Sequence, residues 1–493
     1  MMNLRVIILL LLLFPGAALS NHAEFTPTLR KAWKEMFVLQ FDSMYALTSQ
    51  ARNQAAAAYI ESYGDFLKAF ISEEEKDFNR LKNRIDERLD QVEKISSKSP
   101  WKRMMRAEML LHLAVVKFKW KEYFTAAYYF RKSFHLLEDN KRAFPDFAPN
   151  QRALGFFHAA IGTVPENYKW ISNLIGLKGT VTQGESELTR VSQMIRNSKE
   201  WGFMYDETIF LKALMQGLFK KDYESAQATL SDPGFGTGGQ GAMHTFILAN
   251  SFAAGGKQAQ ALEILQNFNA EKGSYPMLYL QFMRGNFMLN RLDLTAEKYL
   301  LKYTAEFKGR SFIRSAWHKL AWIELLKGNE NGYQEKMKKI TVTGSDFTDE
   351  DKQAMKEAVN GEKPDLTLLR SRLLFDGGLY DRALEEISRK PANYWQRERD
   401  QAEVTYRLAR IHDQQNQFDQ AISLYQKTYN LWKSKEWYFA SNAALHLAMI
   451  YEKQGLPAKA REWYRKTLAL RNHEYQDSID QKAEAGLDRV GRR

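Results

Sequence analysis

Cysteine is absent from the 493 residues of this chain. This absence excludes disulfide bonds, thiolate metal sites and cysteine nucleophiles. Proline and glycine are sparse, with 11 and 28 residues, and they gather at a few places. The long stretches between them are rich in Ala, Leu, Lys, Glu and Gln, a composition that is typical of an all-helical chain.

Long hydrophobic runs are also missing, because no stretch beyond the N-terminus reaches the ~20 apolar residues of a transmembrane helix. The first 20 residues combine Arg5, an apolar run over 6–14 and small residues at Ala18 and Ser20, which is the order of an export signal. We expect cleavage after Ser20 and an exported protein, either periplasmic or associated with the outer membrane. An uncleaved membrane anchor is the alternative, although the run is short for a bilayer span.

The chain has an excess of positive charge, with a formal net charge of +12. Arg5 is the one charged residue of the predicted signal, so the mature chain would carry +11. For an exported protein this charge does not indicate nucleic acid. It fits an acidic protein, an anionic lipid or an acidic polysaccharide as partner, unless the charge serves only solubility.

Two segments near the C-terminus follow one pattern of small and aromatic residues. Leu408 and Ala409 are followed by Ala421 and Tyr425, and the same spacing recurs in a second segment at Leu447, Ala448, Ala460 and Tyr464. Two helices approach closely only where the facing residues are small. The pattern therefore predicts a helical hairpin that crosses at its alanines, with the tyrosine filling the groove toward the next hairpin.

The second small position recurs along most of the chain. It falls at Ala126, Ala226, Ala261, Ala296, Ala383, Ala421 and Ala460. This pattern is similar to the tetratricopeptide repeat, and it predicts an all-α, tetratricopeptide-like superhelix over 101–475. The gap between Ala296 and Ala383 has room for two repeats, of which one is expected over 316–340 with a degraded second helix. We expect an N-terminal helical region over 21–100 and a C-terminal helix or tail over 476–493.

The N-terminal helical region contains one strongly amphipathic helix. Its apolar residues are Phe78, Leu81, Ile85, Leu89, Val92 and Ile95, spaced three or four apart. Ser72 and Glu75 have the spacing of a capping box at its start, and Pro100 is expected to mark its end.

Two motifs that suggest chemistry have simpler explanations. The G-x-G-x-x-G match over 236–241 lies between two helix-like segments, with no strand before it, so we interpret it as a connection between hairpins. The acidic run over 346–351 lacks the glycine and distal glutamate of a calcium loop. Thr348 as the cap of a helix with acids in its first turn accounts for it.

No motif in the chain indicates an enzyme. The nine histidines form neither H-x-x-x-H nor H-E-x-x-H, and no G-x-S-x-G elbow is present. We therefore expect no catalytic residues, no metal and no cofactor.

The segment over 150–190 has its own arrangement of glycines, which predicts an irregular helical insert over 150–200. Val164-Pro165, the run Ile175-Gly-Leu-Lys-Gly179 and the run Gly184-Glu-Ser-Glu-Leu188 follow one another. In this order the segment resembles the eukaryotic inclusion-body-clearance and outer-mitochondrial tetratricopeptide family, with Leu177 in place of the usual aromatic. The resemblance implies an all-helical scaffold without enzymatic activity. In type, the whole chain is also similar to exported tetratricopeptide proteins of Gram-negative bacteria.

A helical superhelix offers a concave groove, lined by the first helices of successive hairpins. The predicted groove residues are Asp365, Leu368, Arg372, Phe375, Glu403, Tyr406, Arg410, Asp413, Asn442, Leu445, Met449 and Glu452. Their mixture of apolar, aromatic and charged side chains suits an extended peptide or a partner helix. We expect a protein-interaction scaffold or adaptor of the cell envelope. The alternative is a carrier or surface protein that binds anionic lipid or polysaccharide through a basic face.

Overall fold

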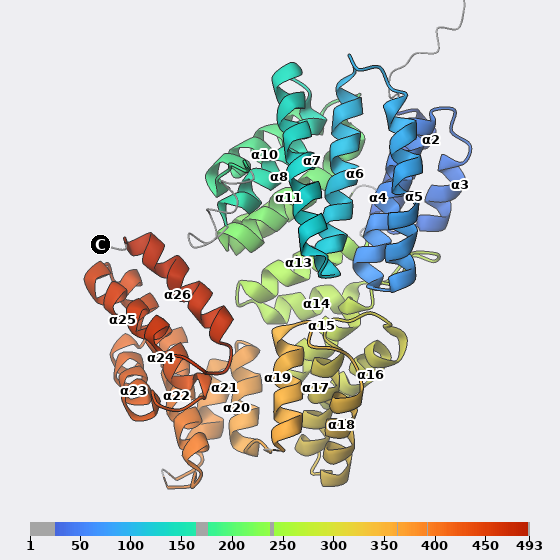
Figure 1. The fold of residues 1–493 in the computed structure, drawn as a ribbon. Coiled ribbons are helices and arrows are strands. Elements are labelled where there is room, and N and C mark those ends of the chain that lie inside the picture. The colour runs from blue at the N-terminus through green and yellow to red at the C-terminus, as the bar shows by residue number, and fades with distance from the viewer. Residues whose placement is uncertain (1–24, 164–175, 237–240, 362, 392, 492–493) are drawn as a thin grey trace, which may run out of the picture.

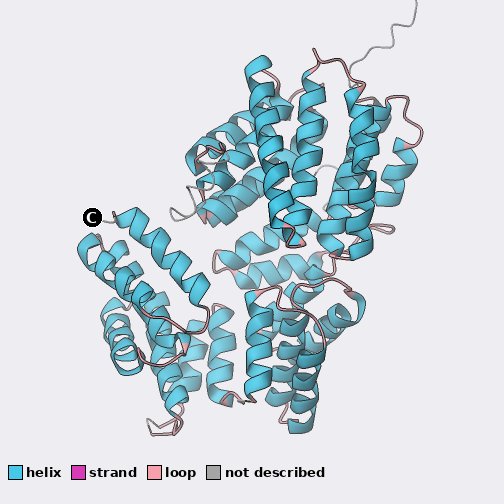
Figure 2. Ribbon diagram, in the orientation of Figure 1, coloured by secondary structure: helices cyan, strands magenta, loops and turns pink. Residues whose placement is uncertain are grey.

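The computed structural model describes residues 25–163, 176–236, 241–361, 363–391 and 393–491. All regular structure in these ranges is helical, with no strand (Figure 2). The predicted signal peptide and Val164 to Ile175 lie outside the described residues. None of the described helices is long and apolar enough to cross a bilayer.

The helices follow one another as antiparallel neighbours along a curved stack (Figure 1). The first part of the chain forms α2 (Pro27–Phe37), α3 (Phe41–Thr48), α4 (Gln54–Ser72), α5 (Glu75–Glu93), α6 (Pro100–Lys119), α7 (Tyr123–Ala143), α8 (Ala148–Gly162), α10 (Val181–Arg196), α11 (Tyr205–Met215), α12 (Tyr223–Leu230), α13 (Ala242–Ala254) and α14 (Gln258–Asn267). The second part forms α15 (Tyr279–Leu289), α16 (Glu297–Glu306), α17 (Ile313–Leu326), α18 (Glu330–Val342), α19 (Asp349–Asn360), α20 (Leu366–Asp376), α21 (Tyr380–Ser388), α22 (Glu398–Gln414), α23 (Phe418–Trp432), α24 (Tyr438–Lys453), α25 (Pro457–Ala469) and α26 (Gln476–Val490). The prediction of an all-α, tetratricopeptide-like superhelix is confirmed.

The predicted alanine crossings are present in the C-terminal hairpins. Ala409 and Ala421 are fully buried where α22 packs on α23, as are Ala448 and Ala460 in the hairpin of α24 and α25. The Tyr425 ring stacks on His446 of the next hairpin, with centroids 5.5 Å apart and planes 8° apart. Small residues thus bring the two helices of one hairpin together, and the aromatic residue joins that hairpin to its neighbour.

The stretch between Ala296 and Ala383 differs from the expected pair of repeats. It holds one hairpin, α17 with α18, followed by the single helix α19, which packs on both. The second helix of the hairpin, expected to be degraded, is a regular helix of 13 residues. Thr348 caps α19 as predicted, because its hydroxyl accepts a hydrogen bond of 3.1 Å from the amide of Asp351.

In the region of the predicted insert, helices α8 and α10 pack together as a regular hairpin, which the sequence pattern did not indicate. Gly155 of α8 and Gly184 of α10 lie at their crossing. A Cβ atom added to Gly184 would clash with the carbonyl oxygen of Gly155 and would lie 2.7 Å from the amide nitrogen of Ala159. Glycine here takes the place that alanine has in the C-terminal hairpins.

The predicted capping box at Ser72 is wrong. Helix α4 continues through Ser72, and Glu74 precedes α5 as its N-cap without a capping hydrogen bond from its side chain. The Ser72 hydroxyl accepts instead from the amide of Glu74, at 3.1 Å. Helix α5 ends at Glu93, whereas Pro100 is the first residue of α6. Most of the predicted apolar face is buried as expected.

The C-terminal hairpins curve back toward the middle of the chain (Figure 1). The side chain of Gln258 on α14 donates a hydrogen bond of 3.0 Å to the carbonyl of Asp376, at the end of α20. Helix α26 packs on α24 and α25 and closes the stack at the C-terminal end.

Candidate partner-binding groove

The predicted groove residues lie on three first helices of hairpins, as the repeat pattern requires. Asp365 caps α20, where it accepts a hydrogen bond of 3.0 Å from the amide of Leu368. Leu368 and Leu445 are each only 1% exposed and belong to the core, so the prediction that they are available to a partner is wrong. Met449, on α24, is 44% exposed.

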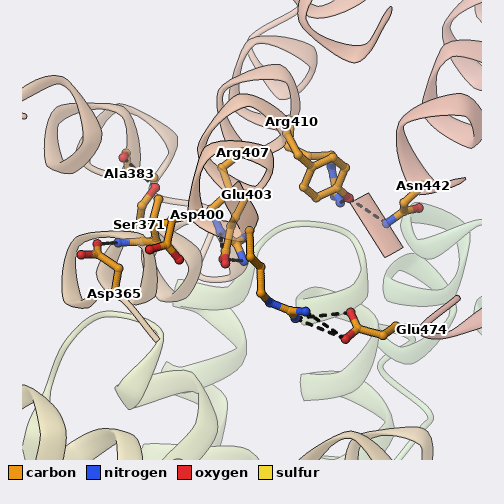
Figure 3. A network of polar contacts seen from close by, with 12 residues as sticks. Asp365, Ser371, Ala383, Asp400, Glu403, Arg407, Arg410, Asn442 and Glu474 are labelled. Atoms are coloured by element: carbon orange, nitrogen blue, oxygen red, sulfur yellow. Dashed lines mark hydrogen bonds and ion pairs between the residues drawn. The ribbon is translucent and has the colours of Figure 1, made fainter. Parts of the chain in front are cut away.

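Tyr406 connects α22 to α24 although its ring is buried. Its hydroxyl accepts a hydrogen bond of 2.9 Å from the Arg410 guanidinium and one of 2.7 Å from the Asn442 amide (Figure 3). The Arg410 guanidinium also lies over the Phe375 ring of α20, 4.8 Å from its centroid. Four predicted residues from three helices are therefore in one contact network.

The remaining acidic residues of the prediction are engaged by neighbouring side chains. Asp413 accepts a hydrogen bond of 3.0 Å from the Tyr425 hydroxyl. Glu452 pairs with Arg489 of α26 at 2.6 Å, and Glu403 pairs with Arg407 at 2.5 Å. These three carboxylates hold neighbouring side chains in place. Their negative charge is therefore already balanced or hydrogen-bonded within the protein.

A cleft extends the groove beyond the predicted residues. Arg372 and Glu403 are the two predicted residues that line it, and the others come from α17, α19, α20, α22, α24 and the loops before α20, α22 and α26. They are Trp322, Gln353, Glu357, Lys363, Pro364, Leu369, Arg397, Arg399, Asp400, Tyr438, Phe439 and Tyr475. The predicted groove omitted residues of α17 and α19, because these helices lie in the stretch where the alanine spacing is lost and the groove register cannot be extended.

The loop before α26 forms the C-terminal rim of this cleft. Glu474 pairs with Arg399 of α22 at 3.2 Å and with Lys356 of α19 at 3.6 Å. The Tyr475 ring meets the Tyr438 ring edge to face, with centroids 5.4 Å apart. Residues far apart in the sequence are thereby fixed around one opening.

Two cations lie beside the buried Trp322 ring under the cleft. The Arg372 guanidinium lies 5.0 Å from its ring centroid and the Lys319 ammonium 5.5 Å from it. Burial lowers the pKa of Lys319 to about 8, and the nearby charge of Arg372 acts in the same direction. A negative charge brought to this place would therefore stabilise the protonated lysine.

Four cations along the inner surface have no carboxylate partner. Among the described residues, no ion pair within 4.0 Å involves Lys319, Arg372, Arg410 or Lys482. Burial lowers the pKa of Lys482, and Lys221 and Arg410 add to the effect. The Arg407, Arg399 and Arg397 side chains nearby are all paired with acids. The groove therefore has a surplus of positive charge beside the half-buried rings of Tyr438 and Tyr475.

Within the described residues, no group of three or more histidine, aspartate and glutamate side chains could hold a metal ion. The glycine match over 236–241 lies partly outside the described residues. The helices α12 and α13 flank it on either side, as expected.

Comparison with known proteins identifies the repeat in the region of the groove. The sequence profile of the tetratricopeptide repeat matches residues 400–473. None of the curated proteins matches the chain in sequence. Two solved structures are similar over most of their length: the APC/C hetero-tetramer Cut9–Hcn1, at 13% identity over 94% of this chain and 95% of that chain, with a TM-score of 0.25, and yeast Tom70, at 12% identity over the same shares, with a TM-score of 0.23. The tetratricopeptide fold is generally that of a protein-interaction scaffold.

Proposed function

We propose that this protein is a non-enzymatic scaffold or adaptor that binds an extended, acidic segment of a partner protein in the groove. The observation that carries the proposal is the pair of cations, Lys319 and Arg372, that lie beside the buried Trp322 ring without an ion pair. Arginine and lysine recognise carboxylates through charge and hydrogen bonds, and contact with the ring holds the two cations in place. Such anchors contribute most of the binding energy in many interfaces.

Binding of a partner in the groove is tested by site-specific photo-crosslinking in the intact chain. A photoreactive side chain at Met449 should capture a partner in the cell of origin, and one at Leu431, an exposed position on α23, should not. Arg372→Glu should reduce the yield at Met449 at least about tenfold, because it replaces an attraction by a repulsion. Arg389→Glu is the matched control, since Arg389 is an exposed arginine at the C-terminal cap of the outer hairpin helix α21. Equal crosslinking in both variants would contradict the proposal.

The acidic character of the partner segment is tested with peptides. An oligoglutamate peptide should change the tryptophan fluorescence of the chain, with an affinity that falls as salt is raised, and Trp322→Phe should remove most of this change among the eleven tryptophans. An oligolysine peptide of the same length should have no effect. Binding of both peptides, or of neither, would remove the charge complementarity on which the proposal depends.

The cellular compartment is proposed from the first 20 residues alone. An export signal there would place the groove in the periplasm or at the outer membrane. Sequencing the N-terminus of the mature protein would find Asn21 first if cleavage follows Ser20. An intact Met1 in a soluble cytosolic fraction would contradict this.

The alternative function is a carrier or surface protein that binds anionic lipid or polysaccharide through the same basic groove. Binding to anionic vesicles or acidic glycans that Arg372→Glu abolishes, without any protein crosslinked at Met449, would favour it.

A further inference from the structure

The loop end of hairpin α6–α7 exposes a cluster of aromatic side chains, and we call residues 117–132 the aromatic tip. Phe118, Tyr123, Phe124 and Tyr128 are 57%, 52%, 95% and 59% exposed. Elsewhere in the described residues, large exposed apolar side chains are scattered over separate helices. An aromatic cluster that is open to solvent marks a contact surface, because packing within the chain does not use it.

The helical periodicity places these rings on the side away from the core. Ala126 is fully buried where α7 crosses α6. Phe124, Tyr128 and Arg131 are spaced by four and three residues on α7, and all three are exposed. The Phe118 ring at the end of α6 meets Tyr123 edge to face, with centroids 5.2 Å apart. The exposed rings therefore lie close to one another around the loop.

The aromatic tip is also basic. It contains five basic residues and one acidic residue, Glu122. Glu122 forms an ion pair with Lys117 at 2.5 Å. Lys119 pairs with Glu73 of the neighbouring hairpin at 2.8 Å. Within the part of the chain that the structure describes, Lys121, Arg131 and Lys132 form no ion pair, and Lys132 lies 5.8 Å from the Tyr128 ring centroid. Three cations thus surround the exposed rings without a counter-charge.

We propose that the aromatic tip inserts into the headgroup region of an anionic phospholipid bilayer. Aromatic rings are favoured at this depth, and lysine and arginine beside them reach anionic headgroups while their stems stay in apolar surroundings. The surplus of cations beside the exposed rings is complementary to an anionic headgroup layer, which is why we assign a lipid surface as the partner. The surface lies on a different hairpin from the groove, so a tip bound to lipid leaves the groove free for a partner.

Vesicle co-sedimentation of the full chain tests this proposal. The probes are phosphatidylcholine vesicles, with or without one third phosphatidylglycerol. The chain should bind the anionic vesicles, and binding should weaken with salt. Phe124→Ser should lower the partition coefficient about tenfold, because it removes an inserted ring. Lys121→Gln should lower it about fivefold, the effect of one cation near an anionic surface.

Tyr128→Ser and Tyr394→Ser form the matched pair of variants. Both tyrosines are exposed, and each lies beside a lysine, Lys132 or Lys390. Only Tyr128→Ser should weaken vesicle binding. A tryptophan at position 124 should shift its emission to the blue and be quenched by brominated lipid.

Three outcomes would overturn the proposal. The first is a wild-type chain that does not bind anionic vesicles, and the second is binding that the tip variants leave unchanged. The third is capture of a purified protein by a photoreactive group at 124 in place of lipid. The groove variant Arg372→Glu should leave vesicle binding unchanged. The proposal for the groove and the proposal for the aromatic tip can therefore be tested separately.

Discussion

The two ends of the molecule are built from different kinds of core. The C-terminal hairpins share a core of alanines and large aromatics that runs from Ala402 to Leu487. The N-terminal hairpins also bury charge: Arg152 is fully buried and lies 2.8 Å from Glu108 and 3.0 Å from Glu207. Burial raises the pKa of Glu207, and the Arg152 guanidinium, which is shared with Glu108, opposes this shift. The C-terminal region buries Arg407 as well, but its partner Glu403 is half-buried, so the fully enclosed ionic network belongs to the N-terminal region.

The largest effect is expected from breaking the ionic network. Arg152→Met leaves Glu108 and Glu207 buried without their cation, which should destabilise the N-terminal region by about 3–5 kcal/mol. Arg489→Met in the C-terminal region breaks a pair that is largely open to solvent and should change stability by less than about 1 kcal/mol. Urea unfolding of both variants measures the difference, and similar losses would contradict the contrast between the regions.

The glycine crossing of α8 and α10 should be less tolerant than its alanine counterparts. Gly184→Ala adds a Cβ atom where the Gly155 backbone already lies, and should destabilise the protein by about 1–3 kcal/mol. Gly217→Ala is the matched control, because a Cβ atom there meets nothing within 4 Å. Thermal unfolding compares the two, and a neutral Gly184→Ala would show that the crossing can widen at no cost.

The smallest effect is a loss of stability at acidic pH, which is expected in both regions. Burial lowers the pKa of His112 to about 3 in the N-terminal region and that of His446 to about 4 in the C-terminal region. The unfolded chain binds these protons near pH 6.5, so the stability that neutral histidine provides is present above pH 6.5 and falls as the pH drops toward 4. The loss should be about 1 kcal/mol for each histidine in the first pH unit.

His446→Gln separates the regions in this experiment. It should weaken the pH dependence of the C-terminal region and leave that of the N-terminal region intact. Denaturant unfolding at pH 7 and pH 5, with a probe in each region, measures this. An unchanged slope in the C-terminal region would contradict the role given to His446.

The sequence predicted the superhelix where small residues recur at helix crossings, and it failed where another feature replaced them. Ala421 and Ala460 could be recognised because their spacing repeats. The crossing of Gly155 with Gly184 follows the same steric rule, but glycine more often indicates a turn. The capping box at Ser72 was wrong because α4 extends through it, so that its hydroxyl serves the turn between two helices.

The groove was only partly predictable for a similar reason. Arg372 and Glu403 each follow from the helical register of their own hairpin, α20–α21 and α22–α23. Trp322 and Lys319 come from a helix outside the regular spacing, and Glu474 comes from a loop. No local pattern indicates that these residues meet, because their contacts depend on how far the stack curves.

The sequence by itself determined that this chain is helical, that its helices pair, and which alanines they cross at, since these are matters of neighbouring residues and local sterics. The tertiary structure alone decided which cations stay without a partner and which aromatic rings stay exposed. Both depend on the distance between hairpins that are far apart in the chain, and a charge is unpaired only when the whole fold brings no opposite charge to it.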